Sequence, residues 1–166
     1  DKDELEEYVD ELELDEGRDI PPGELYKYLF NKDTCRQVVE DLMREGLRIN
    51  GGENIGKSII FAYHHKHAQL HVASFYELFP DHVGECQLVD YSVNYSKKLV
   101  DQFKEDPKFR IAVSVDMLDT GVDIPEVLNL VFFKTVRSKI KFMQMIGIGT
   151  RLRPNLYGPK IDKDKF

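Results

Sequence analysis

Short apolar runs alternate with segments of helical periodicity through most of this 166-residue chain, and this alternation limits the possible folds more than any other feature. Apolar runs predict buried strands at residues 58–63, 86–90, 110–115 and 128–133. Apolar positions three or four residues apart predict helices over 33–46, 66–79 and 94–105, and another helix capped by Ser138. Strands that alternate with helices of about 10–15 residues are typical of βαβ units. The sequence therefore predicts an α/β fold, with a parallel sheet covered by helices on both faces.

The first 32 residues do not follow this pattern. Residues 1–16 hold ten acidic side chains against one lysine, and Leu5, Val9 and Leu12 lie at helical spacing among them. Glycine and proline then interrupt the chain over residues 17–23. We therefore divide the chain into an acidic helix and linker, 1–32, and an α/β domain, 33–166. The acidic helix is expected to pack on a neighbouring domain by one edge or to stay in solvent.

The net charge of -7 at first argues against a nucleic-acid partner. The charge is segregated, however, because residues 1–16 carry -9 whereas residues 134–166 carry +7. A basic segment of this kind suits phosphate, whether of ATP or of DNA. The total charge therefore does not exclude a nucleic-acid partner.

Other classes of protein are disfavoured by composition. No apolar run reaches the roughly 18–20 residues of a membrane span, so we expect no membrane partner. Cys35 and Cys86 have no zinc-type spacing and are expected to be buried thiols of a cytoplasmic protein. We accordingly expect no resident metal site.

Residues 51–58 read Gly-Gly-Glu-Asn-Ile-Gly-Lys-Ser and fit the G-x-x-x-x-G-K-[ST] pattern of a P-loop. A P-loop requires a strand before the loop and a helix directly after it, because the helix N-terminus helps to hold the phosphates. Here the predicted helix precedes the loop and a strand follows Lys57. The match is therefore interpreted as a coincidence.

The carboxyl ends of parallel strands are where such folds bind ligands, so the loop at residues 116–125 is a candidate site. Gly121 allows close approach of backbone to a ligand, and Asp123 can accept hydrogen bonds from ribose hydroxyls. The loop could equally be a tight polar turn whose aspartates serve as caps. A Mg²⁺ site is another option, since carboxylates suit that ion, but the sequence fixes no ligand geometry.

Residues 144–154 close the βαβ pattern with two glycines and two arginines. The guanidinium of Arg151 can bind phosphate with two parallel hydrogen bonds and keeps its charge at every relevant pH. Gln144 lies one turn before the first glycine and can project to the same side. The alternative is a helix end at Gly147 and Gly149 followed by solvated arginines.

Three segments in fixed order carry a resemblance to a known family. Residues 59–68, with His64-His-Lys66-His, the loop 115–127, and Gln144-Met-Ile-Gly-Ile-Gly-Thr-Arg151-Leu resemble motifs IV, V and VI of superfamily-two helicases. The resemblance is closer still to the motor of type I restriction enzymes, in the restriction (R) subunit, and covers roughly residues 30–166.

The resemblance implies the second RecA-like lobe of an ATP-dependent DNA translocase. It implies catalytic roles for Arg151, as the arginine finger, and for Gln144. Gly121, Asp123 and Gly147 then face the nucleotide. The nucleic-acid contacts that it implies are those of His64, Lys66, Ser114 and Thr120. ATP and Mg²⁺ are expected to be bound mainly by a first lobe that this chain does not contain.

The resemblance also implies partners. These are double-stranded DNA, the first lobe and nuclease domain of the same subunit, and the modification and specificity subunits. The chain is accordingly expected to be a fragment that is inactive alone. Two alternatives stay open, namely a lobe of another DNA or RNA helicase of the superfamily, and a flavodoxin-like interaction module without an ATP role.

One position departs from the family pattern, which has arginine where this chain has Ile148. An aliphatic side chain cannot supply the charge of an arginine finger, which contributes about 10³–10⁵ in rate in related motors. Either Arg151 suffices, or ATPase coupling is lost, or the change was introduced artificially. If position 148 has a finger role, Ile148→Arg should raise DNA-stimulated ATP hydrolysis.

Overall fold

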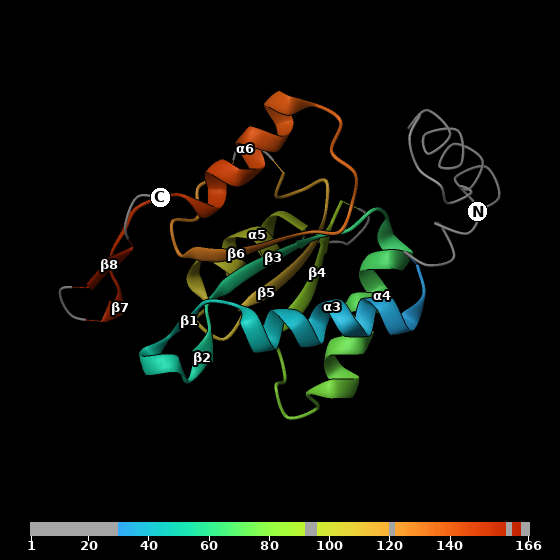
Figure 1. The fold of residues 1–166 in the computed structure, drawn as a ribbon, viewed down its shortest axis with the longest axis horizontal. Coiled ribbons are helices and arrows are strands. Elements are labelled where there is room, and N and C mark those ends of the chain that lie inside the picture. The colour runs from blue at the N-terminus through green and yellow to red at the C-terminus, as the bar shows by residue number, and fades with distance from the viewer. Residues whose placement is uncertain (1–29, 92–95, 120–121, 159–160, 164–166) are drawn as a thin grey trace.

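The structure is a computed structural model that describes residues 30–91, 96–119, 122–158 and 161–163. Its centre is a sheet of parallel strands in the order β4-β5-β3-β6 (Figure 1). The strands are β3 (Lys57–Phe61), β4 (Cys86–Asp90), β5 (Ile111–Val115) and β6 (Val127–Phe132). Each lies within two residues of its predicted bounds. The predicted α/β fold with a parallel sheet is therefore confirmed.

Helices cover both faces of the sheet. On one face lie α3 (Lys32–Glu45) and α4 (His65–Leu78), and on the other lie α5 (Ser96–Glu105) and α6 (Lys139–Gly149). The strand β3 shows why two cores form, because Ile60 packs toward α3 and α4 while Ile59 and Phe61 pack toward α5 and α6. All three side chains are fully buried. Burial on both faces explains why the last three residues of this strand form a continuous apolar run rather than an alternating pattern.

Smaller elements flank the sheet. The two-residue strands β1 (Arg48–Ile49) and β2 (Asn54–Ile55) pair antiparallel across the short helix η1 (Asn50–Gly52). After α6, the chain forms an antiparallel pair of β7 (Arg153–Gly158) and β8 (Ile161–Lys163). Neither pair joins the central sheet.

Helix ends follow capping chemistry, with one correction to the prediction. The N-cap of α3 is Asn31 rather than Asp33, because the Asn31 side chain accepts a hydrogen bond from the Asp33 backbone N–H at 2.9 Å. Gly46 ends this helix as expected. Ser138 caps α6, as predicted, by accepting a hydrogen bond from the Lys141 backbone N–H.

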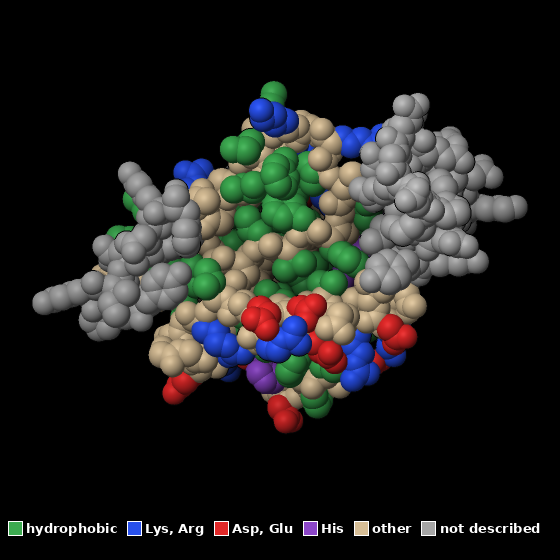
Figure 2. Space-filling model, viewed as in Figure 1, with side chains coloured by type: hydrophobic (Ala, Val, Ile, Leu, Met, Phe, Trp, Pro, Cys, Tyr) green, Lys and Arg blue, Asp and Glu red, His purple; other side chains and the backbone are tan. Residues whose placement is uncertain are grey.

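Charged and apolar side chains occupy different parts of the surface. Figure 2 shows hydrophobic side chains gathered between α6 and α3, above a row of charged side chains along the solvent side of α3. That row includes ion pairs within the helix, such as Arg36 with Glu40 at 3.3 Å and Arg44 with Asp41 at 2.6 Å. None of the described helices is both long enough and apolar enough to cross a membrane. The acidic helix predicted for residues 1–16 lies outside the described residues.

Candidate active site and nucleic-acid edge

A pocket of about 590 Å³ opens between the loop after β5 and the end of α6. It is lined by Val122, Asp123, Gln144, Gly147, Ile148, Thr150 and Arg151. Four of these residues, Asp123, Gln144, Gly147 and Arg151, were singled out from the sequence as catalytic or nucleotide-facing. The fold therefore brings together residues from two separate sequence segments in one pocket.

Asp123 and Arg151 face each other across this pocket. The Arg151 Nε lies 3.6 Å from the Asp123 Oδ1, and both side chains are largely exposed. An exposed pair at this distance contributes little to stability, about 0–1 kcal/mol. The guanidinium can therefore leave the carboxylate for a stronger anionic partner at small cost.

The helix α6 supplies one wall of the pocket. Gln144 and Gly147 lie three residues apart, so both project from the same side of the helix. A Cβ built on Gly147 would meet no atom of the described residues within 4 Å, so the glycine leaves open space beside the glutamine amide. An amide, a guanidinium and free volume are suited to a phosphate-bearing ligand.

Ile148 forms an apolar part of the pocket wall. Its side chain is only 4% exposed and packs in the core beneath α5 and α6. The position where the family pattern has arginine is therefore a packed aliphatic one here. An arginine at position 148 would have to direct its guanidinium out of the core and into the pocket.

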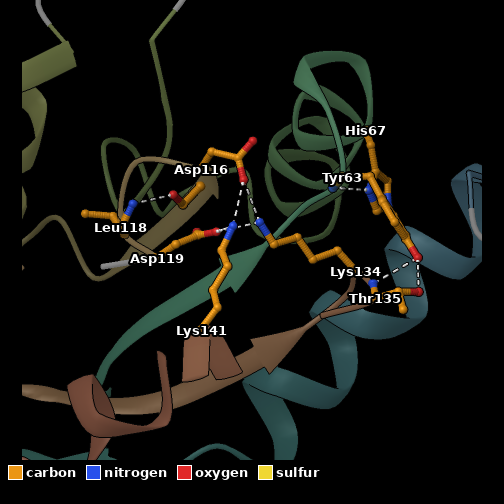
Figure 3. A network of polar contacts seen from close by, with 9 residues as sticks. Tyr63, His67, Asp116, Leu118, Asp119, Lys134, Thr135 and Lys141 are labelled. Atoms are coloured by element: carbon orange, nitrogen blue, oxygen red, sulfur yellow. Dashed lines mark hydrogen bonds and ion pairs between the residues drawn. The ribbon is translucent and has the colours of Figure 1, made fainter. Parts of the chain in front are cut away.

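A second group of polar residues lies at the carboxyl edge of the sheet (Figure 3). The Lys134 Nζ, after β6, donates to the Asp116 Oδ1 at 2.8 Å and to the Asp119 Oδ2 at 2.6 Å, both after β5. The Lys141 Nζ, on α6, lies 3.0 Å from the same Asp119 oxygen. The Asp119 Oδ1 is buried and has no hydrogen-bond partner among the residues that the structure describes. Sequence reasoning did not pair these lysines with the aspartates.

Two charges in this group shift each other's proton affinity. Burial alone would raise the pKa of Asp116, but the hydrogen bond and charge of Lys134, with Lys141, bring that pKa below its ordinary value. Burial would lower the pKa of Lys141, but Asp119 and Asp116 raise it instead. Both groups are therefore held in their charged forms, and the loops after β5 and β6 are tied to α6.

A second tie joins the ends of β3 and β6. The Tyr63 hydroxyl and the Thr135 Oγ1 are 2.7 Å apart, and the Thr135 backbone N–H donates to the same hydroxyl at 2.9 Å. The Tyr63 backbone N–H in turn donates to the His67 Nδ1 at 3.2 Å. The carboxyl edge is thus a connected polar surface that reaches into α4.

The four residues predicted to contact nucleic acid are placed differently. Ser114 is fully buried and its Oγ accepts a hydrogen bond from the Leu118 N–H at 3.1 Å, so this placement disagrees with a DNA contact and we drop that role. His64 caps α4 by accepting from the His67 N–H, and its ring stacks on Phe30. Lys66 is exposed in the first turn of α4. Thr120, like Gly121 in the nucleotide-facing set, lies outside the described residues.

Lys57 confirms that the P-loop match is a coincidence. It begins β3 at the amino ends of the parallel strands, away from the candidate site, and a strand rather than a helix follows the loop there. Its ammonium is nearly buried and donates to the backbone carbonyl oxygens of Phe103 and of Lys104, the latter at 2.8 Å. Lys57 therefore caps the C-terminal end of α5.

Comparison with known proteins gives the family. Residues 37–152 match the helicase conserved C-terminal domain. The chain is 30% identical over 136 residues to the endonuclease subunit of the type I restriction enzyme EcoKI of Escherichia coli K12. That match covers 76% of this chain and 11% of the subunit, so the chain spans about a tenth of that relative.

Solved structures agree in fold. The C-terminal domain of a variant of S. cerevisiae Dbp5, bound to a Gle1 variant and IP6, has a TM-score of 0.53 at 19% identity, covering 78% of this chain and 68% of that one. A Dbp5 variant bound to RNA and ADP BeF3 has a TM-score of 0.52 at 22% identity, covering 73% and 31%. The sheet flanked by helices is therefore a RecA-like fold of the helicase type. With the family match over residues 37–152, this chain belongs to the helicase conserved C-terminal domain family.

Proposed function

We propose that this chain is the second motor lobe of an ATP-dependent DNA translocase, in the restriction subunit of a type I restriction enzyme. The observation that carries the proposal is the pocket in which Asp123, Gln144, Gly147 and Arg151 meet. The identity of 30% to the EcoKI endonuclease subunit supports the restriction-enzyme assignment. ATP, Mg²⁺, the first lobe, the nuclease domain and the modification and specificity subunits belong to the complete enzyme, and the isolated chain is proposed to be inactive.

In this proposal Arg151 acts on the γ-phosphoryl group of ATP held by the first lobe. Charge spreads over the oxygens of that group in the transition state, and a guanidinium placed beside them stabilises it. Arg151 is available because the ion pair that it makes with Asp123, within the described part of the chain, is an exposed one. Gln144 lines the same pocket and would orient groups around the reacting phosphate.

The nucleic-acid side of the proposal uses the carboxyl edge. Lys66 is exposed there at the start of α4, and His64 precedes it. Thr120 and Gly121 complete the set that we propose for DNA and nucleotide. The family match favours this reading over a flavodoxin-like module without an ATP role.

The test is Arg151→Ala in the complete motor subunit, with DNA-stimulated ATP hydrolysis as the readout. We expect kcat to fall by about 10³-fold or more, as for arginine fingers in related motors. Arg151→Lys should rescue little, because an ammonium lacks the planar fork of guanidinium. Arg153→Ala is the matched control, since Arg153 pairs with Glu126 at 3.1 Å and does not line the pocket.

Two outcomes would contradict the proposal. If Arg151→Ala keeps the wild-type kcat, this residue is not a finger. If RNA stimulates hydrolysis and duplex DNA does not, the chain is a lobe of an RNA helicase instead.

A further inference from the structure

Three potential metal ligands meet between α3 and α4, away from the pocket described above. They are Cys35 on α3 and His67 and His71 on α4. The thiol sulfur and one ring nitrogen of each histidine all lie within 4.8 Å of one another. All three side chains are buried. From this geometry we propose that Cys35, His67 and His71 form a binding site for a thiophilic divalent ion, Zn²⁺ first.

The spacing of the ligands fits a tetrahedral ion. His67 and His71 are four residues apart on one helix, so their rings lie on the same side of it. Their Nε2 atoms are 3.1 Å apart. Two nitrogens bound to one Zn²⁺ at about 2.0–2.1 Å in tetrahedral geometry are about 3.3 Å apart. The Cys35 sulfur, within 4.8 Å of the histidine nitrogens, would be the third ligand, which leaves one position for a water or another ligand.

The surroundings hold both histidines in the neutral form that binds metal. Burial lowers the pKa of His71 to about 4, although the nearby Cys35 backbone partly opposes the shift. Burial, and then the neighbouring His71, lower the pKa of His67 to about 2. The ring of Phe133 lies 4.9 Å from that of His67 and 5.2 Å from that of His71. Such an apolar shell excludes water and strengthens binding of an ion.

The Cys35 thiol is the ligand whose protonation state an ion would change. Burial raises the pKa of the Cys35 thiol to about 11. A bound metal ion would supply a positive charge beside the sulfur and deprotonate the thiol.

Binding requires two proton movements. The Cys35 thiol proton passes to the buffer when the sulfur binds the metal. The His67 Nδ1 accepts a hydrogen bond from the Tyr63 N–H, so the ring proton is on Nε2 and must move to Nδ1. That movement breaks the bond from Tyr63, whose hydroxyl holds Thr135 at the carboxyl edge. Metal binding is thus linked to the end of β3, and this inference does not rest on the proposed function.

The experiment uses the 166-residue chain, stripped with a chelator under reducing conditions and titrated with Co²⁺. We expect one equivalent to bind with a thiolate-to-cobalt charge-transfer band, and Zn²⁺ to displace it. Cys35→Ser should remove the band and weaken Zn²⁺ binding by at least about 100-fold, since even outer-shell changes cost 10–100-fold. Cys86→Ser is the matched control, because Cys86 is also buried but lies outside the cluster.

A second variant keeps the test independent of folding defects. His71→Leu should retain helical circular dichroism, because the site is apolar, and lose the cobalt band. In the wild-type chain, Zn²⁺ should also shift the amide resonance of Tyr63. The proposal is overturned if the folded wild-type chain binds neither ion at millimolar concentration, or if Cys35→Ser gives an unchanged cobalt spectrum.

Discussion

Replacement of Lys57 by methionine should destabilise the domain by about 2–4 kcal/mol and leave nucleotide binding by the complete motor subunit unchanged. The side chain is nearly buried, and its ammonium donates to the carbonyl oxygens of Phe103 and Lys104 at the end of α5. Methionine keeps the length of the side chain but cannot donate a hydrogen bond. The two carbonyl groups then lose their donor.

The magnitude follows from opposing contributions. Hydrogen bonds to charged groups contribute about 1.5–3 kcal/mol each, and an unsatisfied buried acceptor costs about 1–3 kcal/mol. Against these stands the desolvation of the ammonium, which lowers the pKa of Lys57 despite the opposing charge of Glu126. The substitution also removes the cation–π contact of the Lys57 Nζ, which lies 5.3 Å from the centre of the Phe103 ring. The net loss of about 2–4 kcal/mol is smaller than the sum of the bonds because desolvation is relieved.

Urea unfolding followed by circular dichroism measures this loss. With a slope of about 2 kcal/mol per molar urea, the midpoint should fall by about 1–2 M. Lys98→Met is the control, since Lys98 is an exposed lysine on α5, the helix that Lys57 caps. This substitution should change the free energy of unfolding by less than about 0.5 kcal/mol. If Lys57→Met keeps its midpoint and nucleotide binding is abolished, the P-loop reading is right and the capping role is wrong.

Three further substitutions test the packing and the pocket. Asn129→Leu removes the buried amide that bonds Leu47 N–H and C=O, and should cost about 2–4 kcal/mol in urea unfolding. Gly46→Ala places a Cβ 2.5 Å from the Leu42 carbonyl oxygen, and should lower the unfolding free energy by about 1–3 kcal/mol; unchanged unfolding would contradict it. Ile148→Arg should cost about 2–4 kcal/mol in the chain, and raise DNA-stimulated ATP hydrolysis in the complete subunit; unchanged turnover would refute a finger role.

The arrangement of strands and helices could be predicted because burial on both faces gives the parallel strands continuous apolar runs. The strand β3 is the clearest case, since Ile59, Ile60 and Phe61 are all fully buried. Helix ends were harder, because asparagine and aspartate both cap well and only geometry separates Asn31 from Asp33.

The pocket residues could be anticipated because the carboxyl ends of parallel strands meet at one edge. The burial of Ser114 could not be anticipated, since it depends on a turn that folds the chain back after β5. Asp116 adopts a positive φ of 56° there, and the Leu118 N–H then reaches the Ser114 hydroxyl. No residue pattern predicts that turn, because aspartate adopts the left-handed backbone conformation only occasionally.

The polar ties and the three-ligand cluster depend on contacts between distant segments. Lys134 and Asp119 are 15 residues apart, and Cys35 is separated from His67 by the strands β1, β2 and β3 and the short helix η1. One local signal was available, because two histidines four residues apart on a predicted helix share a face. Cys35, on the predicted helix at residues 33–46, is then a candidate third ligand.

The central position of β3 has a consequence for the order of events during synthesis. Its neighbours β5 and β6 come later in the chain, and roughly 70 residues separate the end of β3 from the end of β6. At about 5–20 residues per second, a ribosome needs roughly 4–14 s to make that stretch. Until β6 is made, the nascent chain exposes at least one unpaired edge of β3, whose Ile59, Ile60 and Phe61 are buried in the folded domain. Chaperone demand and aggregation should therefore depend on how quickly translation passes residues 111–132.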